Sequence, residues 1–142
     1  MRKILFRAKR VDNKEWIEGS YIESVVAASP VGYITPSYPT EPTPIYTLTL
    51  GQFTGMCDKN YNKIFEGDII DFGINQRLMY VHWNGESLAW EITDVGVSDC
   101  EVNHLHNTFD LAEIQVEAAY GEMFSEVVGN IHDNPELLKC GE

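Results

Sequence analysis

One short stretch in the middle of the chain restricts the fold more than any other. From Leu78 to Trp83 the side chains alternate between two faces, as they do in a half-buried β-strand. Asn84-Gly85 follows at once, and an Asn-Gly pair between apolar runs is the strongest short-range signal for a β-hairpin. Leu88–Ile92 supplies the returning strand. The sequence therefore predicts an antiparallel pair here.

Short apolar runs separated by turn residues continue along most of the chain. Further strands are expected at Ile4–Phe6, Trp16–Ile22, Val31–Thr35, Tyr46–Leu50, Ile69–Phe72, Val95–Val102 and Val127–Ile131. Trp16–Ile22 can form one bent strand or a bulged pair, because a Gly-Ser pair interrupts it. Gly67 lies in a predicted turn, where we expect it to take a positive φ.

Two segments toward the C-terminus favour helices. Asp110 and Glu113 have the spacing of a helix capping pair, although Leu111–Val116 also has the period of a strand. Asn134-Pro135 predicts the start of a short terminal helix, with Asn as the cap and Pro in the first position. Both helix and strand therefore stay open for the first segment, and a helix is expected for the second.

These elements predict a mainly β fold class: antiparallel strands curled into a barrel-like domain, with one or two short helices toward the C-terminus. No linker divides the chain, so a single domain is expected over 1–142. It includes an exposed proline-rich loop at 35–44, because Pro has no ladder donor. It also includes an insert at 94–125, for which helix, strand and disorder are all open.

The net charge excludes some classes of function and says little about the fold. Ten Lys and Arg against 22 Asp and Glu give a net charge of −12, too acidic for direct binding of nucleic acid or of an anionic membrane. The chain has no apolar run of membrane-spanning length and no signal-peptide pattern at its start. Three widely spaced cysteines suit a reducing compartment. We therefore expect a cytoplasmic protein.

Basic and acidic residues are divided unevenly along the chain. Six of the ten basic residues lie in the first fourteen positions, and none lies between Leu78 and Leu138. That second stretch contains twelve acidic residues: Glu86, Glu91, Asp94, Asp99, Glu101, Asp110, Glu113, Glu117, Glu122, Glu126, Asp133 and Glu136. Three interpretations are open: contact between the two regions within one chain, head-to-tail contact between copies, and binding of a basic partner by the acidic half.

The best-looking cluster of metal-ligating residues is Cys100, His104 and His106. In an extended stretch these side chains share one face, and two imidazoles with a thiolate can hold zinc. The cluster has no CxxC or HExxH motif and no second paired set of ligands. Solvated polar side chains explain it more simply, so we assign no metal ligands.

No catalytic motif is present, whether for phosphate binding or for a nucleophilic serine. Glu66 and Asp68 have the placing of an acid–base pair, but a turn closed by Asp68 is the simpler interpretation. Trp16, Trp83 and Trp90 are candidates for stacking on nucleic-acid bases, but the strand of Trp83 has no basic residues. Core packing is therefore expected for these rings, with no catalytic residues and no cofactor.

Three segments of the chain carry one pattern when they are taken as a set. They are Arg2-Lys3-Ile4-Leu5-Phe6-Arg7-Ala8, then Gln52 to Asn60 continuing through Lys63-Ile64-Phe65-Glu66-Gly67-Asp68-Ile69-Ile70, and finally Glu126 to Leu138 with Gly129-Asn130-Ile131 and Asn134-Pro135. Together they resemble the YopX-like family of phage and prophage proteins. The proline-rich loop and residues 94–125 match nothing in the family pattern. The shared residues look like turn makers and a helix start, which a fold requires and chemistry does not.

The resemblance implies a mainly β fold, a bacterial host cell, self-association and no established enzymatic activity. We therefore expect an accessory protein that binds an unidentified host or phage protein, and that also forms homo-oligomers. The expected contact surface is acidic and consists of Glu113, Glu117, Glu122 and Glu126. Two alternatives remain: a self-assembling structural phage component, and a metal-dependent enzyme using the Cys100 cluster.

Overall fold

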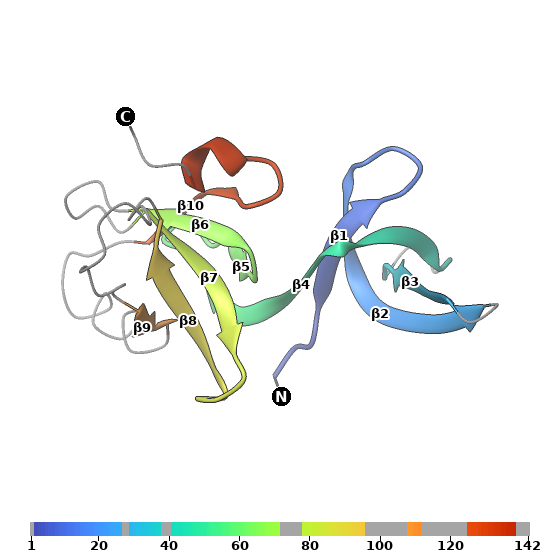
Figure 1. Ribbon diagram of the computed structural model, residues 1–142, viewed down its shortest axis with the longest axis horizontal. Helices are drawn as coiled ribbons and strands as arrows, with labels where there is room; N and C mark the ends of the chain where they lie inside the picture. Colours follow the sequence, from blue (N-terminus) through green and yellow to red (C-terminus); the bar gives the residue numbers. More distant parts are fainter. Residues whose placement is uncertain are drawn as a thin grey trace. The chain divides into compact units, whose positions relative to one another are not determined.

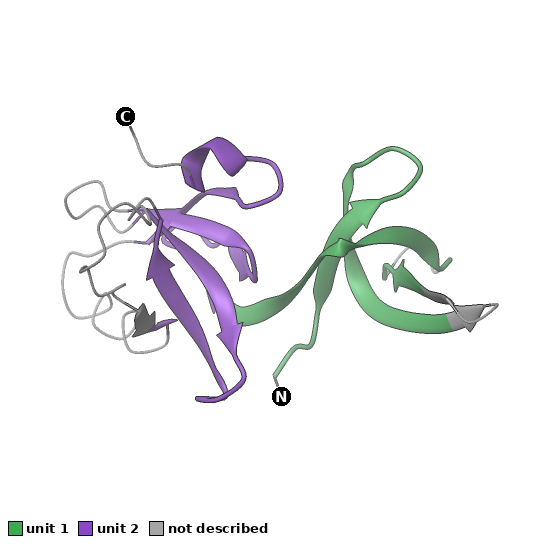
Figure 2. Ribbon diagram, in the orientation of Figure 1, with its two compact units in different colours: residues 1–55 green, residues 56–142 purple. Residues whose placement is uncertain are grey.

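The computed structural model describes residues 2–26, 29–37, 41–71, 78–95, 108–111 and 125–138. Contacts within the chain divide it into two compact units, Met1–Gly55 and Met56–Glu142 (Figure 2). Both are built from antiparallel strands, so the expected mainly β fold is confirmed (Figure 1). The expected single domain over 1–142 stays a prediction.

The first unit is a sheet that closes into a ring. Its strands are β1 (Phe6–Arg10), β2 (Trp16–Val26), β3 (Ser29–Thr35) and β4 (Thr43–Cys57). They pair in chain order, and β1 also pairs with β4, which completes the ring. The expected barrel-like curl is therefore confirmed as one ring-like sheet, which is not a true barrel. β2 is one continuous strand, and β4 continues past Gly55 to pair with β5 (Lys63–Phe65).

Small residues allow the strands of the ring to approach closely. Ala8, Ile34 and Ile45 form its buried core. A Cβ added to Gly19 of β2 would lie 2.2 Å from the carbonyl oxygen of Thr35, at the end of β3. Glycine is therefore required at this close approach, and the ring depends on it.

The second unit contains a separate sheet in the order β10-β6-β7-β8-β9. Its strands are β6 (Asp68–Asp71), β7 (Leu78–Asn84), β8 (Ala89–Asp94), β9 (Thr108–Asp110) and β10 (Glu126–Asn130). One face buries a larger aliphatic core, which consists of Ile64, Ile70, Met79, Val81, Ile92 and Leu111. The alternation predicted from Leu78 to Trp83 is confirmed for Met79 and Val81, which both point into this core.

Several local predictions need correction. The terminal helix is a four-residue 3-10 turn, η1 (Pro135–Leu138), rather than an α-helix. Gly55, which lies in a segment of the resemblance interpreted as turn makers, has a φ of 91° but lies inside β4 and not in a turn. The strand expected at Val95–Val102 falls outside the described residues beyond Val95, as does the element at 110–118 beyond Leu111. Of the proline-rich loop, residues 38–40 also fall outside them.

Candidate interaction surface

Asp58 is the buried centre of the turn that opens the second unit. Its carboxylate accepts hydrogen bonds from the backbone N–H groups of Asn60 (2.9 Å), Asn62 (2.8 Å) and the distant Val127 (3.0 Å). Burial works against the charged form, but these bonds outweigh it and hold the pKa of Asp58 below its usual value. Asp58 therefore ties the start of β10 to a turn almost seventy residues earlier in the chain.

The turn at Glu66-Gly67-Asp68 is also used for structure. The fully buried Asp68 carboxylate accepts a hydrogen bond from the Phe65 N–H at 2.8 Å, which closes the turn as the simpler interpretation predicted. Gly67 has the expected positive φ, at 86°. Its carbonyl accepts a hydrogen bond from the Ile131 N–H at 2.9 Å, so this turn also fixes the segment after β10.

Asn130 organises the C-terminal turn in the same way. Its side-chain oxygen accepts hydrogen bonds from the backbone N–H groups of His132 and Asp133. A Cβ at Gly129 would lie 2.4 Å from the Asn134 side-chain oxygen, so glycine is needed there. Residues of the second and third segments of the resemblance thus form three braced turns of the second unit.

Most members of the predicted acidic surface fall outside the described residues, namely Glu113, Glu117 and Glu122. Glu126 is described, and its carboxylate lies 2.8 Å from the Lys59 ammonium. That ion pair joins the Asp58 turn to β10, and both side chains are partly exposed. Glu126 therefore already has an ion-pair partner within its own unit.

The candidate metal ligands Cys100, His104 and His106 also fall outside the described residues. Within the parts of the chain that the structure describes, no three His, Cys, Asp or Glu side chains are grouped so as to hold a metal ion. His82 lies 2.8 Å from the Thr93 hydroxyl on the neighbouring strand. Cys57 is a free, exposed thiol at the end of β4.

The two units differ sharply in charge. Residues 1–55 contain six basic and five acidic residues, a net charge of +1. Residues 56–142 contain four basic and seventeen acidic residues, a net charge of −13. The charge division seen in the sequence therefore coincides with the structural division.

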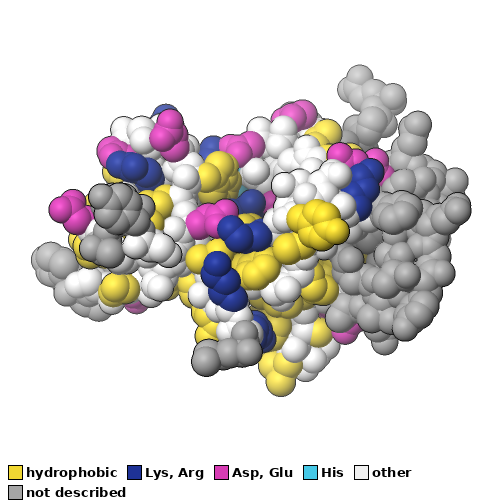
Figure 3. Space-filling view, turned by 180° about the vertical axis from the view of Figure 1, so that it is seen from behind, with side chains coloured by type: hydrophobic (Ala, Val, Ile, Leu, Met, Phe, Trp, Pro, Cys, Tyr) yellow, Lys and Arg dark blue, Asp and Glu magenta, His cyan; other side chains and the backbone are white. Residues whose placement is uncertain are grey.

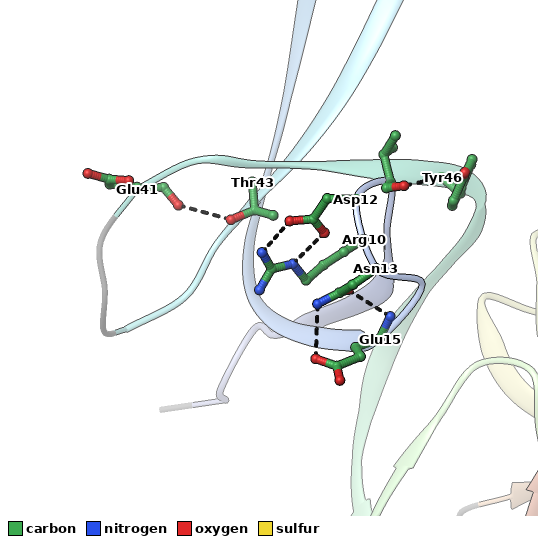
Figure 4. Close-up of polar contacts among 8 residues, drawn as sticks. Arg10, Asp12, Asn13, Glu15, Glu41, Thr43 and Tyr46 are labelled. Atoms are coloured by element: carbon green, nitrogen blue, oxygen red, sulfur yellow. Dashed lines mark hydrogen bonds and ion pairs between the residues drawn. The ribbon is translucent and has the colours of Figure 1, made fainter.

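Basic side chains of the first unit have partners close by in the chain. Arg10 forms a two-point contact with Asp12, at 2.9 and 2.6 Å (Figure 4). This pair is exposed to solvent and contributes little to stability. The Arg7 guanidinium and the Lys9 ammonium lie 4.7 and 5.4 Å from the centre of the Trp16 ring.

A large bulge in β4 exposes a leucine close to β1, the strand that contains Arg7 and Lys9. Arg7 pairs with Gly51 but Lys9 pairs with Tyr46, so β4 has three more residues than β1 at this point. Thr49 closes the bulge by accepting a hydrogen bond from the Lys9 N–H at 2.8 Å. Leu48, within the bulge, is 92% exposed. Bulges of this kind redirect side chains, and here the result is an apolar group in solvent.

The tip of the β7–β8 hairpin, residues 83–90, is the corresponding feature of the second unit. Trp83 is 43% exposed and packs edge-on against Trp90, with ring centres 5.0 Å apart. The expectation of core packing is therefore wrong for Trp83. Leu88 is 72% exposed and has a φ of 54°. The sequence predicted the hairpin but gave no signal for these exposures, which follow from a four-residue loop.

Exposed hydrophobic side chains also lie among the charged ones elsewhere on the surface (Figure 3). Scattered apolar residues are normal on a soluble surface and need no explanation. The hairpin tip differs because the partly exposed Trp83 and the exposed Leu88 belong to one hairpin. Among the described residues, no helix is long and apolar enough to cross a membrane.

Comparisons with known proteins identify the group to which this chain belongs. A search of curated proteins finds no match. Among solved structures, the crystal structure of protein EF1440 from Enterococcus faecalis is similar, with 22% identity and a TM-score of 0.47. The likeness covers 98% of this chain and 100% of that one. The family model described as YopX protein matches residues 5–139, across both units. With nearly its whole length matched, the chain belongs to the YopX family.

Proposed function

We propose that the chain is a phage- or prophage-encoded accessory protein, and that it binds a host or phage protein through its acidic second unit. The observation that carries this proposal is the division of charge, +1 in the first unit against −13 in the second. A surface with so much charge of one sign attracts a partner of the opposite sign and speeds its association. The partner is therefore expected to be basic.

The described contacts support binding rather than catalysis as the role. The polar groups in the segments that resemble the family pattern, at Asp58, Asp68 and Asn130, accept hydrogen bonds from backbone groups of their own chain. Side chains used in this way stabilise turns and are not positioned to react with a substrate. We therefore expect exposed acidic side chains, rather than these turns, to contact other molecules.

Affinity capture from host lysate, with and without infection, tests this proposal. The tagged protein would be washed and eluted in a salt ramp, and the eluted proteins identified by mass spectrometry. Because salt screens exposed charges, a stoichiometric partner should be released as ionic strength rises. Capture of no partner, or of a partner that high salt does not release, would refute the proposal.

Self-association is a second candidate role, as in a structural phage component. It is favoured by the same charge difference. The basic residues of the first unit in one copy would attract the acidic second unit of another copy in a head-to-tail contact. Native mass spectrometry over a range of concentrations tests it. Oligomers that dissociate in salt are expected, and a strict monomer would eliminate this role.

A further inference from the structure

We propose that the tip of the β7–β8 hairpin, residues 83–90, forms part of the surface through which the second unit contacts its partner, together with the acidic side chains of that unit. The matching partner segment has an arginine or lysine beside an apolar side chain. This inference rests on the proposed function and assigns it a place and a chemistry. Exposure, rigidity, backbone conformation and charge support it independently.

The hairpin tip extends beyond its neighbouring strands. β6 pairs with β7 only along Leu78–Tyr80, and β9 pairs with β8 only along Glu91–Thr93. One residue past this pairing on the β7 side, the Gly67 N–H donates a hydrogen bond to the Val81 carbonyl, at 2.9 Å. Beyond these points the two strands pair with each other, and Figure 1 shows the turn projecting past its neighbours.

Side chains within the loop make this projection rigid. The Asn84 side-chain oxygen accepts a hydrogen bond from the Glu86 N–H at 2.8 Å, while its amide group donates to both Glu91 oxygens at 3.0 and 3.1 Å. The Ser87 hydroxyl also donates to Glu91, at 2.8 Å. A loop that is held in one conformation before binding loses less entropy when a partner arrives.

Leu88 is the residue that this rigid loop presents. It has a φ of 54°, in the left-handed region that glycine or asparagine normally occupies at the end of such loops. A leucine there costs backbone free energy, and its side chain gains no burial in return, because it is 72% exposed. Gly85, in the same loop, has no positive φ. Burial against a partner would recover the cost at Leu88.

The charge around the loop determines which partner fits. Glu86 is exposed at the turn, Glu91 lies beneath it, and the whole stretch from Leu78 to Leu138 has no Lys or Arg. The Trp83 side chain is 43% exposed, and an exposed tryptophan ring can bind a cation. An arginine or lysine therefore fits beside Trp83 and Glu86, and an apolar neighbour fits against Leu88.

Solution NMR with a defined probe tests this assignment on the full chain. The probe is a short blocked peptide that alternates Arg and Leu, and the matched peptides replace either Leu by Ser or Arg by Glu. We expect the Arg/Leu peptide to shift the Trp83 indole and the amides of residues 84–89, and the matched peptides to bind at least about tenfold more weakly. Shifts elsewhere only, or equal binding of the three peptides, would overturn the assignment.

The variant Leu88→Gly separates binding from folding. It should raise the urea midpoint, because glycine accepts the positive φ, while weakening the Arg/Leu peptide about tenfold or more. Leu48→Ala, at the exposed leucine of the first unit, is the matched control and should leave peptide binding unchanged. Equal affinity of Leu88→Gly and the unaltered protein would refute the role of the loop.

Lysate capture with the same variant distinguishes the two proposals. If the unaltered protein and Leu88→Gly retain the same salt-sensitive partner equally, the acidic unit binds it elsewhere and only the hairpin assignment fails. If neither retains a partner, the proposed function itself fails. Hairpin shifts that arise from raising the protein concentration alone would show that the occupant is a second copy, and would overturn the assigned partner.

Discussion

The two units of this chain are stabilised by different means. The first closes a ring around a small core of Ala8, Ile34 and Ile45, with strands brought together at glycines. The second has a larger aliphatic core, and its turns are braced by buried polar side chains such as Asp58 and Asp68. The first is nearly neutral and the second has a net charge of −13.

This difference shows which acidic groups of the second unit stabilise its fold. Buried carboxylates, at Asp58 and Asp68, accept backbone hydrogen bonds and secure turns of this unit. In the first unit, close backbone packing replaces these polar braces. A change in one unit can therefore be compared with a matched change in the other.

The largest effect is expected from Asp58→Ala. Three backbone N–H groups, including that of Val127, would lose their acceptor, at a cost of about 3–5 kcal/mol in the second unit. Amide hydrogen exchange, which reports each unit separately, measures this cost. Asp12→Ala is the control, because its exposed pair with Arg10 contributes little. Equal losses in both variants would contradict the role of Asp58.

The next largest loss of stability is expected from Gly19→Ala, and it should affect the first unit. The added Cβ would meet the Thr35 carbonyl oxygen at 2.2 Å, so the backbone of β2 or β3 must shift, at a cost of about 2–3 kcal/mol. Gly85→Ala meets no atom within 4 Å and should change stability by less than about 0.5 kcal/mol. The same amide exchange data decide between these values. A Gly19→Ala ring as stable as the original would show that the close approach is not needed.

Acid should weaken the second unit through Asp58. Its pKa is lower in the folded state than in the unfolded chain, so its stabilising effect is complete above the unfolded pKa, near 4, and is lost as pH falls through the lower folded value. The stability difference between the unaltered protein and Asp58→Ala should therefore shrink below about pH 4. Urea unfolding at several pH values measures it, and a difference independent of pH would contradict the assignment.

Leu88→Gly should give the smallest change and the opposite sign. Removing a positive-φ leucine from the hairpin loop should stabilise the second unit by about 0.5–1 kcal/mol. Urea unfolding measures the gain, with Leu48→Ala as the reference at an exposed leucine of the first unit. Loss of stability in Leu88→Gly would mean that the side chain contributes to folding.

The sequence predicted what is local and missed what is assembled from distant parts. Alternation gave the β7 strand, and turn residues gave the positive φ of Gly67 and the turn closed by Asp68. The barrel-like curl was predicted, but the β1–β4 pairing that closes the ring was not, because it joins residues about forty positions apart. The bond from Val127 to Asp58 spans still more of the chain and leaves no local pattern.

Candidate surfaces were harder to predict than strands. Period-two alternation places Trp83 on the face of Met79 and Val81, but says nothing about where the neighbouring strands end. Asn84-Gly85 favours a two-residue turn, whereas side-chain bonds to Glu91 hold a four-residue loop that moves the positive φ to Leu88. Exposure at the hairpin tip depends on both of these features.

The central claim is that partner binding belongs to the acidic second unit, and two charge-matched variants test it most directly. One replaces Glu113, Glu117 and Glu122 with Gln in the second unit, and the other makes the same change at the exposed Glu15, Glu23 and Glu41 of the first. In capture from infected lysate at low salt, we predict that the first variant loses most of the partner and the second retains it. Equal retention by both, or greater loss from the first-unit variant, would contradict the account.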